Sequence, residues 1–168
     1  MRILVDGYNL AHASGILARN IGPGTLQKAR DGLVGFLAAS LTEKERPATT
    51  LIFDAKDAPP DVPNEHVCEG IRVVYALGYA TADALIEELI GQDSVPRQLV
   101  VVSSDLRIQR AARRRRATAI GSEQWYADLS RRRRDSLGKK NVSAEKPDAP
   151  SSDAEVEYWL KVFGEDAP

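Results

Sequence analysis

Four aspartates lie at the points where predicted buried strands end or where the following helix begins. They are Asp6, Asp54, Asp83 and Asp105. Because the carboxyl ends of parallel strands share one edge of a sheet, we expect the four side chains to converge on one crevice. Carboxylates brought together repel one another and lose hydration, and a hard divalent cation removes that penalty. Mg²⁺ or Mn²⁺ held by such oxygen ligands can activate water for attack on a phosphodiester.

Each of these aspartates also has an ordinary structural interpretation. An aspartate that follows a strand often closes a turn or caps a helix, and Asp105 by itself fits that description. Asp83 stands two residues after Thr81, where it can complement the dipole of a helix start. Four carboxylates at one predicted edge favour the metal site, provided that the strands are assigned correctly.

The elements that would position these residues follow from the spacing of apolar side chains. Buried strands are predicted at 3–6, 49–54, 71–76, 99–102 and 117–120. Amphipathic helices are predicted around 26–41, 82–90, 108–112 and 125–129, with Thr81 and Ser122 as caps. The proline-containing range 55–70 is predicted to be mostly loop. Strands that alternate with helices predict an α/β fold, with a parallel sheet covered by helices on both faces.

The composition limits the class of protein. A length of 168 residues suits a single domain, and 43% hydrophobic residues can form a real core. No apolar stretch is long enough for a transmembrane helix, and the chain starts with a strand-like run in place of a signal peptide. We therefore expect a cytoplasmic protein that does not associate with membranes. A single cysteine, Cys68, excludes an internal disulfide and a thiolate zinc site.

Basic residues are concentrated in one segment. The net charge is −1, but residues 107–140 carry 12 basic and 3 acidic side chains. We expect arginines of this segment to form a track for a nucleic-acid backbone. They are Arg107, Arg110, Arg113 and Arg114. A second run, 131–134, is expected at the end of the next helix. The alternative is a solubilising charged surface, because consecutive arginines cannot share one helix face.

Two aromatic residues lie within the basic segment. Trp125 and Tyr126 are candidates for stacking on unpaired bases of a nucleic acid. The spacing of Trp125 to Leu129 also suits two positions on the buried face of a helix. We therefore expect Trp125 to belong to the core, and Tyr126 stays open.

The run Ile3-Leu4-Val5-Asp6-Gly7-Tyr8-Asn9-Leu10 resembles the opening motif of the NYN domains, specifically their YacP-like branch within the PIN-like nucleases. Three further pieces follow in the order typical of that family. They are Phe53-Asp54-Ala55, Thr81-Ala82-Asp83 with Glu87, and Ser103-Ser104-Asp105 followed by Gln109 and Arg110. The resemblance covers about residues 2–130. It implies a PIN-like, Rossmann-like three-layer fold and metal-dependent endoribonuclease activity.

The resemblance also implies roles for individual residues. The catalytic core of the metal site would be formed by Asp6, Asp83 and Asp105. Asp54 would be a further metal ligand. Asn9 and Ser104 would steady these ligands or contact a phosphate of the substrate. Many members have a second acidic residue where this chain has Ala84. Glu87, one turn after Asp83, can compensate in part, and the departure leaves room for one metal ion in place of two.

Three functions stay open at this stage. The first is a Mg²⁺- or Mn²⁺-dependent endoribonuclease that hydrolyses single-stranded or ribosome-associated RNA to 5′-phosphate and 3′-hydroxyl ends, as the resemblance implies. The second is a non-catalytic RNA- or ribosome-binding module that has kept the PIN-like fold, which Ala84 favours. The third is a nuclease for DNA. A serine hydrolase and a nucleotide cofactor are not indicated, because the Gly-x-Ser-x-Gly elbow and the glycine-rich phosphate loops are missing.

The last part of the chain differs in composition from the rest. We expect the nuclease domain at 1–135, a flexible linker at 136–151 and a short amphipathic helix at 152–168. In that helix, apolar residues recur with helical spacing at 156, 159, 160 and 163. A helix of this length is not stable alone, so we predict that it docks on its own domain or on a protein partner.

Overall fold

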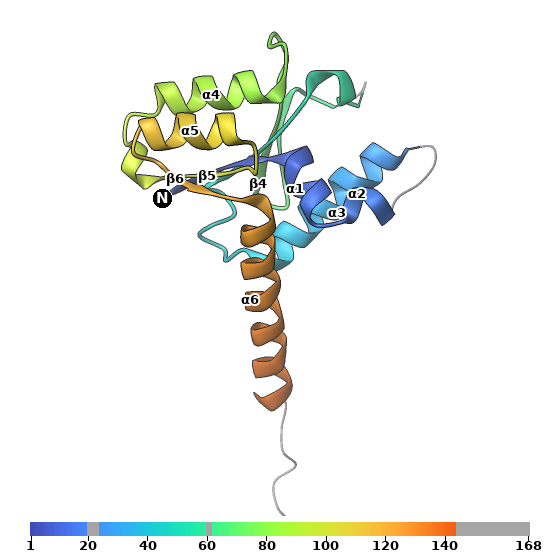
Figure 1. Cartoon of the computed structure of the whole chain (residues 1–168). Helices are drawn as coiled ribbons and strands as arrows, with labels where there is room; N and C mark the ends of the chain where they lie inside the picture. The colour runs from blue at the N-terminus through green and yellow to red at the C-terminus, as the bar shows by residue number, and fades with distance from the viewer. Residues whose placement is uncertain (20–23, 60–61, 144–168) are drawn as a thin grey trace, which may run out of the picture. The chain divides into compact units, whose positions relative to one another are not determined.

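Figure 1 shows a computed structural model of the chain, which describes residues 1–19, 24–59 and 62–143. The chain divides into two units, Met1–Arg133 and Arg134–Pro168. The first unit contains the sheet and all the candidate site residues. Of the second unit, the described part is the end of one helix. The amphipathic helix predicted at 152–168 and its docking lie outside the described residues.

A six-stranded sheet lies at the centre of the first unit. Its strands are β1 (Arg2–Asp6), β2 (Thr49–Phe53), β3 (Glu65–Cys68), β4 (Ile71–Tyr75), β5 (Leu99–Val102) and β6 (Thr118–Ile120). The order across the sheet is β3-β4-β2-β1-β5-β6. Neighbouring strands are parallel except for the antiparallel pair β3–β4. The five predicted strands are confirmed.

Strand β3 is the element that the sequence analysis missed, and the prediction of a loop over most of 55–70 is wrong there. This strand lies at the edge of the sheet, and its side chains are exposed or half-buried. It turns into β4 through Glu69 and Gly70, which both have positive φ, 53° and 80°. An exposed edge strand needs no apolar pattern, so hydrophobic periodicity does not reveal it.

Helices connect most of the strands. They are α1 (Gly7–Ala13), α2 (Ile16–Arg19), α3 (Thr25–Ser40), α4 (Ala82–Gln92), α5 (Leu106–Arg114) and α6 (Ser122–Ser143), with short 3₁₀ helices at Ala55–Asp57 and Pro96–Gln98. Thr81 caps α4 as predicted, because its hydroxyl accepts a hydrogen bond from the Ala84 N–H at 3.3 Å.

Helix α6 extends further than the sequence analysis predicted. It continues to Ser143, so the start of the range 136–151, expected to be a linker, is helical. The arginine run at 131–134 consequently lies inside a helix and not at its end. Despite the length of α6, the described part of the chain contains no helix that combines the length and apolar character needed to span a bilayer.

Helices cover both faces of the sheet (Figure 1). Helices α4 and α5 lie side by side on one face, against Leu4 of β1 and Ile52 of β2. Helices α1, α3 and α6 contribute to the core on the other face, which receives Val5 and Leu51. Successive side chains of a strand point to opposite faces, so each apolar strand supplies both cores. The predicted α/β architecture, with a mostly parallel sheet between helical layers, is confirmed.

The topology itself selects one edge of the sheet as the place for a site. After β1 the chain adds β2 and β4 on one side, and then it crosses to add β5 on the other side. The connections therefore change direction between β1 and β5, and ligands of such sheets bind beyond the carboxyl ends of the strands at this point. Asp6 ends β1, and residues 103–105 follow β5.

Gly7 makes the passage from β1 to α1 possible. A Cβ atom at this position would lie 2.6 Å from Cδ1 of Phe53 and 2.8 Å from the carbonyl oxygen of Ile52. Phe53 is completely buried and the Ile52 carbonyl belongs to the backbone, so neither can move aside cheaply. The residue after Asp6 must be glycine for α1 to start so close to β2.

Replacement of Gly7 by Ala should therefore lower the free energy of unfolding by about 1–3 kcal/mol, through overpacking. The matched control is Gly35→Ala in α3, where a Cβ would have no atom within 4 Å. That control should raise the free energy of unfolding by about 0.5–1 kcal/mol, because alanine is the better helix former. Urea denaturation of both variants tests the difference, and a Gly7→Ala protein as stable as the parent would contradict the packing argument.

Candidate active site

Asp6 is the most buried carboxylate at the carboxyl edge of the sheet, with 8% of its surface exposed. It ends β1 and caps α1, since its Oδ1 accepts a hydrogen bond from the Asn9 N–H at 3.1 Å. Its Oδ2 accepts a second bond from the Ser103 hydroxyl, also at 3.1 Å. Burial raises the pKa of Asp6 to about 6, against the lowering effect of these bonds, and the charges of Asp83 and Asp54 raise it further.

Asp54 follows β2 and connects that strand with α4. Its Oδ1 accepts a hydrogen bond from the Ala82 N–H at 2.7 Å, so it holds the first turn of the helix that carries Asp83. The structure adds this positioning contact to the ligand role that the family resemblance implies for Asp54. Partial burial raises the pKa of Asp83, and so do the charges of Asp105 and Asp54.

Asp105 caps α5, as its ordinary structural interpretation predicts. Its Oδ1 accepts hydrogen bonds from the N–H groups of Arg107 at 2.6 Å and Ile108 at 3.3 Å. The cap occupies one carboxylate oxygen, and the other accepts no hydrogen bond from any described residue. Capping and a place in the acidic cluster are therefore compatible. Asp105 faces Asp83, whose pKa its charge raises.

Electrostatic interactions connect the four predicted aspartates through Asp83. Asp6 senses Asp54 and Asp83, and Asp83 in turn senses Asp54 and Asp105. Across the described residues, however, no three His, Cys, Asp or Glu side chains are grouped so that they could hold a metal ion together. The aspartates are thus electrostatically coupled at one edge of the sheet, and a closed ligand set is not formed among the described residues.

The donor chemistry of this group of aspartates suits a hard divalent cation. All its acidic donors are carboxylate oxygens, and burial and like charge raise the pKa values of two of them, Asp6 and Asp83. A cation would remove both penalties. Mg²⁺ is commonly held through one or two carboxylates and keeps several of its waters, so it does not require three converging side chains. The residues present therefore fit such an ion.

Ser103 connects two of the acidic residues, a role that the sequence analysis missed. The side chain is completely buried; its hydroxyl donates to Asp6 and accepts from the Asp105 N–H at 3.1 Å. Its carbonyl oxygen accepts from Nε2 of Gln109 at 2.8 Å. The signal in the sequence was a small polar residue directly after an apolar strand, beside Ser104 in the recognised motif.

Asn9 and Ser104 both form hydrogen bonds with other residues of the protein. The Ser104 N–H donates to Oδ1 of Asn9 at 3.0 Å. The Ser104 hydroxyl accepts from the Ser122 N–H at 2.9 Å and donates to the carboxylate of Glu123. Both residues therefore steady the turn that carries Asp105, one of the two roles expected of them. In this arrangement the Ser104 hydroxyl hydrogen is not available to a phosphate.

The start of α6 differs from the prediction that Ser122 is its cap. Ser122 is already helical, and its own hydroxyl is buried without a hydrogen-bond partner in the described structure. Ser104, distant in sequence, supplies the capping oxygen. Glu123 was not identified from the sequence, because nothing in the spacing of residues connects it with Ser104. Its hydrogen bond from Ser104 lowers the pKa of Glu123.

The arginines of the predicted track differ in whether their side chains have bonding partners. Arg107 pairs with Glu87, and Arg113 donates to Oε1 of Gln109 at 3.0 Å. Arg110 and Arg114 are exposed, and neither side chain forms a hydrogen bond or ion pair with a described residue. Both oxygens of Glu87 accept hydrogen bonds from Arg107, so this structure shows Glu87 engaged by an arginine.

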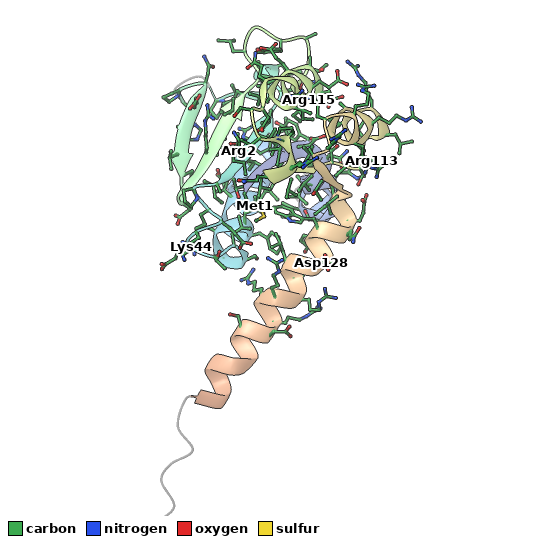
Figure 2. The ribbon with its side chains drawn as sticks, turned by 90° about the vertical axis from the view of Figure 1, so that its left-hand side faces the viewer. Met1, Arg2, Lys44, Arg113, Arg115 and Asp128 are labelled. Carbon is green, nitrogen blue, oxygen red and sulfur yellow. The ribbon has the colours of Figure 1, made fainter. Side chains whose placement is uncertain are left out.

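Arg115, the next residue along the run, has a structural role. It lies on the same side of the molecule as Arg2 (Figure 2), and its guanidinium donates to the carbonyl oxygen of Asp93 at 2.9 Å. The Asp93 carboxylate pairs with Arg2 at 2.6 Å. The arginine run therefore divides between a structural contact at one end of α5 and exposed charges elsewhere.

The two candidate stacking residues pack inside the first unit. Trp125 is 7% exposed and belongs to the core, as its spacing predicted. Tyr126 packs on Phe36 of α3, with ring centroids 4.8 Å apart and planes inclined by 41°. Tyr126 is thus partly buried against another aromatic side chain, which leaves less of its ring for a base.

Comparisons with known proteins agree with this fold. The family model described as YacP-like NYN domain matches residues 3–162. The crystal structure of Rae1 (YacP) from Bacillus subtilis aligns with a TM-score of 0.64 and 24% sequence identity, over 98% of this chain and 92% of that one. A point mutant of Rae1 aligns with a TM-score of 0.67 and 24% identity, over 97% and 92%. At this identity the likeness shows a shared fold. Among curated proteins none matches.

The raised pKa of Asp6 predicts a pH-dependent cost to stability. The pKa is about 6 in the folded chain against an ordinary value of 3.8, so between these values the folded state binds the proton more tightly. The free energy of unfolding should fall as the pH rises through this window and remain lower above it, by on the order of 3 kcal/mol. Asp6→Asn removes the ionisation, so it should be more stable than the parent at pH 7.5 without divalent ions.

Urea denaturation in EDTA at pH 7.5 and pH 4 measures this effect, and the advantage of Asp6→Asn should shrink at the lower pH. Asp128→Asn is the matched control, since Asp128 lies on α6, where it forms an exposed ion pair with Arg131. Equal stability of Asp6→Asn and the parent at pH 7.5 would show that the buried carboxylate carries no such cost.

Proposed function

The chain belongs to the YacP-like NYN domain family, and from this premise we propose that it is a metal-dependent endoribonuclease that hydrolyses phosphodiester bonds of RNA. The family belongs to the PIN-like nucleases. The observation that carries the proposal is the group of mutually repelling carboxylates beyond the carboxyl ends of the strands, at the point where the sheet connections change direction. The repulsion within this group is a cost that a bound cation would relieve.

The residues proposed to hold Mg²⁺ or Mn²⁺, directly or through waters that the ion retains, are Asp6, Asp54, Asp83 and Asp105. When bound, the ion would supply an activated water and neutralise charge that develops on the phosphodiester. Ser103 would keep two of the carboxylates in place, because its hydroxyl bonds to both Asp6 and the Asp105 backbone. Asp54 would fix the position of Asp83 through the first turn of α4.

The proposed substrate contacts are the arginines of α5. Arg107 follows the site carboxylate Asp105 by two residues, and Arg110, Arg113 and Arg114 continue along the same helix. Their charges would attract a polyanion to a crevice whose own charge is negative, and a cation bound there would complete the match. Single-stranded RNA, including RNA on the ribosome, is the proposed substrate class, and DNA is the alternative for a direct comparison.

A second function, RNA binding without cleavage, has one observation in its favour. The position after Asp83 holds Ala84, and among the described residues no three acidic side chains are close enough to share an ion. A protein that has lost turnover would still bind RNA through the α5 arginines. Metal dependence of cleavage distinguishes the two functions.

The first test is cleavage of an RNA with both structured and single-stranded regions, in Mn²⁺, Mg²⁺ or EDTA, beside a DNA of the same sequence. We expect cleavage of RNA with either metal ion and none in EDTA. Asp83→Asn should lower the rate at least about a hundredfold, since it removes a charge from the proposed metal site. Asp128→Asn removes a carboxylate outside the crevice and should cleave at the rate of the parent.

RNA binding without metal-dependent products would reject the nuclease and favour the binding module. Equal rates for Asp83→Asn and the parent would reject the proposed site. Products that form from DNA as fast as from RNA would reject the RNA preference and leave the nuclease itself in place.

The salt dependence of binding tests the arginine contacts. Arg110→Ala with Arg114→Ala removes two exposed guanidinium groups, so the slope of log affinity against log salt should become shallower by about 1.4 for single-stranded RNA. Arg115→Ala removes a guanidinium that bonds to the Asp93 carbonyl, and its slope should stay close to that of the parent. Fluorescence anisotropy over a series of KCl concentrations measures both. An unchanged slope in the double variant would exclude these arginines from the RNA contact.

A further inference from the structure

Arg107 is held near Asp83 and Asp105 by a partner on another helix. It lies in the first turn of α5, and its guanidinium forms two bonds with Glu87 of α4. Nε donates to Oε1 at 2.8 Å and Nη2 donates to Oε2 at 2.6 Å. This is the planar two-bond geometry in which arginine binds a carboxylate, and it is also the geometry in which arginine binds a phosphate.

The position of the pair connects it with the proposed site. The bonds to Glu87 raise the pKa of Arg107, and the charges of Asp83 and Asp105 raise it further, so the guanidinium lies beside two of the proposed metal ligands. Arg107 also lowers the pKa of Asp83. A phosphate that entered the crevice would approach a cation that already has a negative partner.

The pair is open to solvent. The Arg107 side chain is 68% exposed and that of Glu87 is 24% exposed. Exposed ion pairs contribute little to the stability of a fold, because water and salt compete with them. Exchange of one bidentate partner for another is therefore cheap, and neither helix depends on this pair, since apolar side chains hold α4 and α5 together in the core.

We propose that Glu87 competes with a phosphate of the substrate for Arg107, so that RNA binding exchanges the partner of this guanidinium from carboxylate to phosphate. The inference depends on the proposed function, because it assigns a competitor to one of the proposed substrate contacts. It makes Glu87 a determinant of substrate affinity that acts by occupying Arg107. Removal of the Glu87 charge then frees the guanidinium before RNA arrives, and affinity rises.

Helix α4 itself contains a matched control for this effect. Glu88, the next residue, is exposed and bonds to Gln92 on the same helix, away from Arg107. Both Glu87→Gln and Glu88→Gln remove one negative charge from α4 and keep the shape of the side chain. A general loss of repulsion affects both variants, whereas partner exchange affects only Glu87→Gln.

The test measures the affinity of the full chain for a labelled single-stranded oligoribonucleotide, in EDTA at low salt so that no cleavage occurs. Glu87→Gln should bind about two- to fivefold more tightly than the parent, the range expected for release of an exposed ion pair. Glu88→Gln should change the affinity by less than about twofold. In an Arg107→Ala background, Glu87→Gln should gain less than it gains in the parent.

Simple repulsion between Glu87 and RNA predicts the reverse of the last result, because loss of Arg107 leaves Glu87 unpaired and more repulsive. A gain in the Arg107→Ala background that equals or exceeds the gain in the parent would overturn the exchange. Equal affinities of Glu87→Gln and Glu88→Gln would overturn it as well. If either result occurs while the parent chain still binds RNA, the exchange is rejected and the proposed function is retained. A parent chain that neither binds nor cleaves RNA would reject both the exchange and the proposed function.

Discussion

The repulsion between aspartates at one edge of the sheet is the constraint around which the rest of this structure is arranged. Parallel strands bring Asp6 and Asp54 to the same edge, and the helices that follow β4 and β5 add Asp83 and Asp105. Asp6 is also buried, so its charge is costly in the absence of a cation. The surrounding hydrogen bonds reduce this cost without abolishing it, as the raised pKa of Asp6 shows.

Those hydrogen bonds serve two purposes at once. Asp6 and Asp105 cap the helices that begin directly after them, and Asp54 reaches across to the first turn of α4. Each cap satisfies backbone N–H groups that have no partner within the helix. The same contact fixes the carboxylate relative to the sheet. A cap and a metal ligand are therefore not competing interpretations here, because a carboxylate has a second oxygen.

The arginines near the four aspartates neutralise the negative charge at this edge of the sheet only in part. Arg107 is close enough to lower the pKa of Asp83, but its Nε and Nη2 both donate to Glu87. Other arginines of the same helix are exposed, and Arg115 donates a hydrogen bond to the backbone carbonyl of Asp93. The basic segment is thus not a uniform track. The position of each arginine around the helix axis determines whether its side chain reaches a partner among the described residues.

The sequence by itself determined the elements that have a local signature. Buried strands, the Thr81 cap and the four aspartates at the strand ends and helix starts follow from apolar runs and from the chemistry of residues near one another in the chain. The edge strand β3 has no such signature, because it is defined by pairing and not by burial.

Tertiary structure alone decided which residues far apart in the sequence bond to one another. Ser104 caps α6 and binds Glu123, and Arg107 pairs with Glu87, because packing of the helices on the sheet brings these side chains together. Spacing along one element predicts the face on which a side chain lies, but the partner on another element depends on how the two pack.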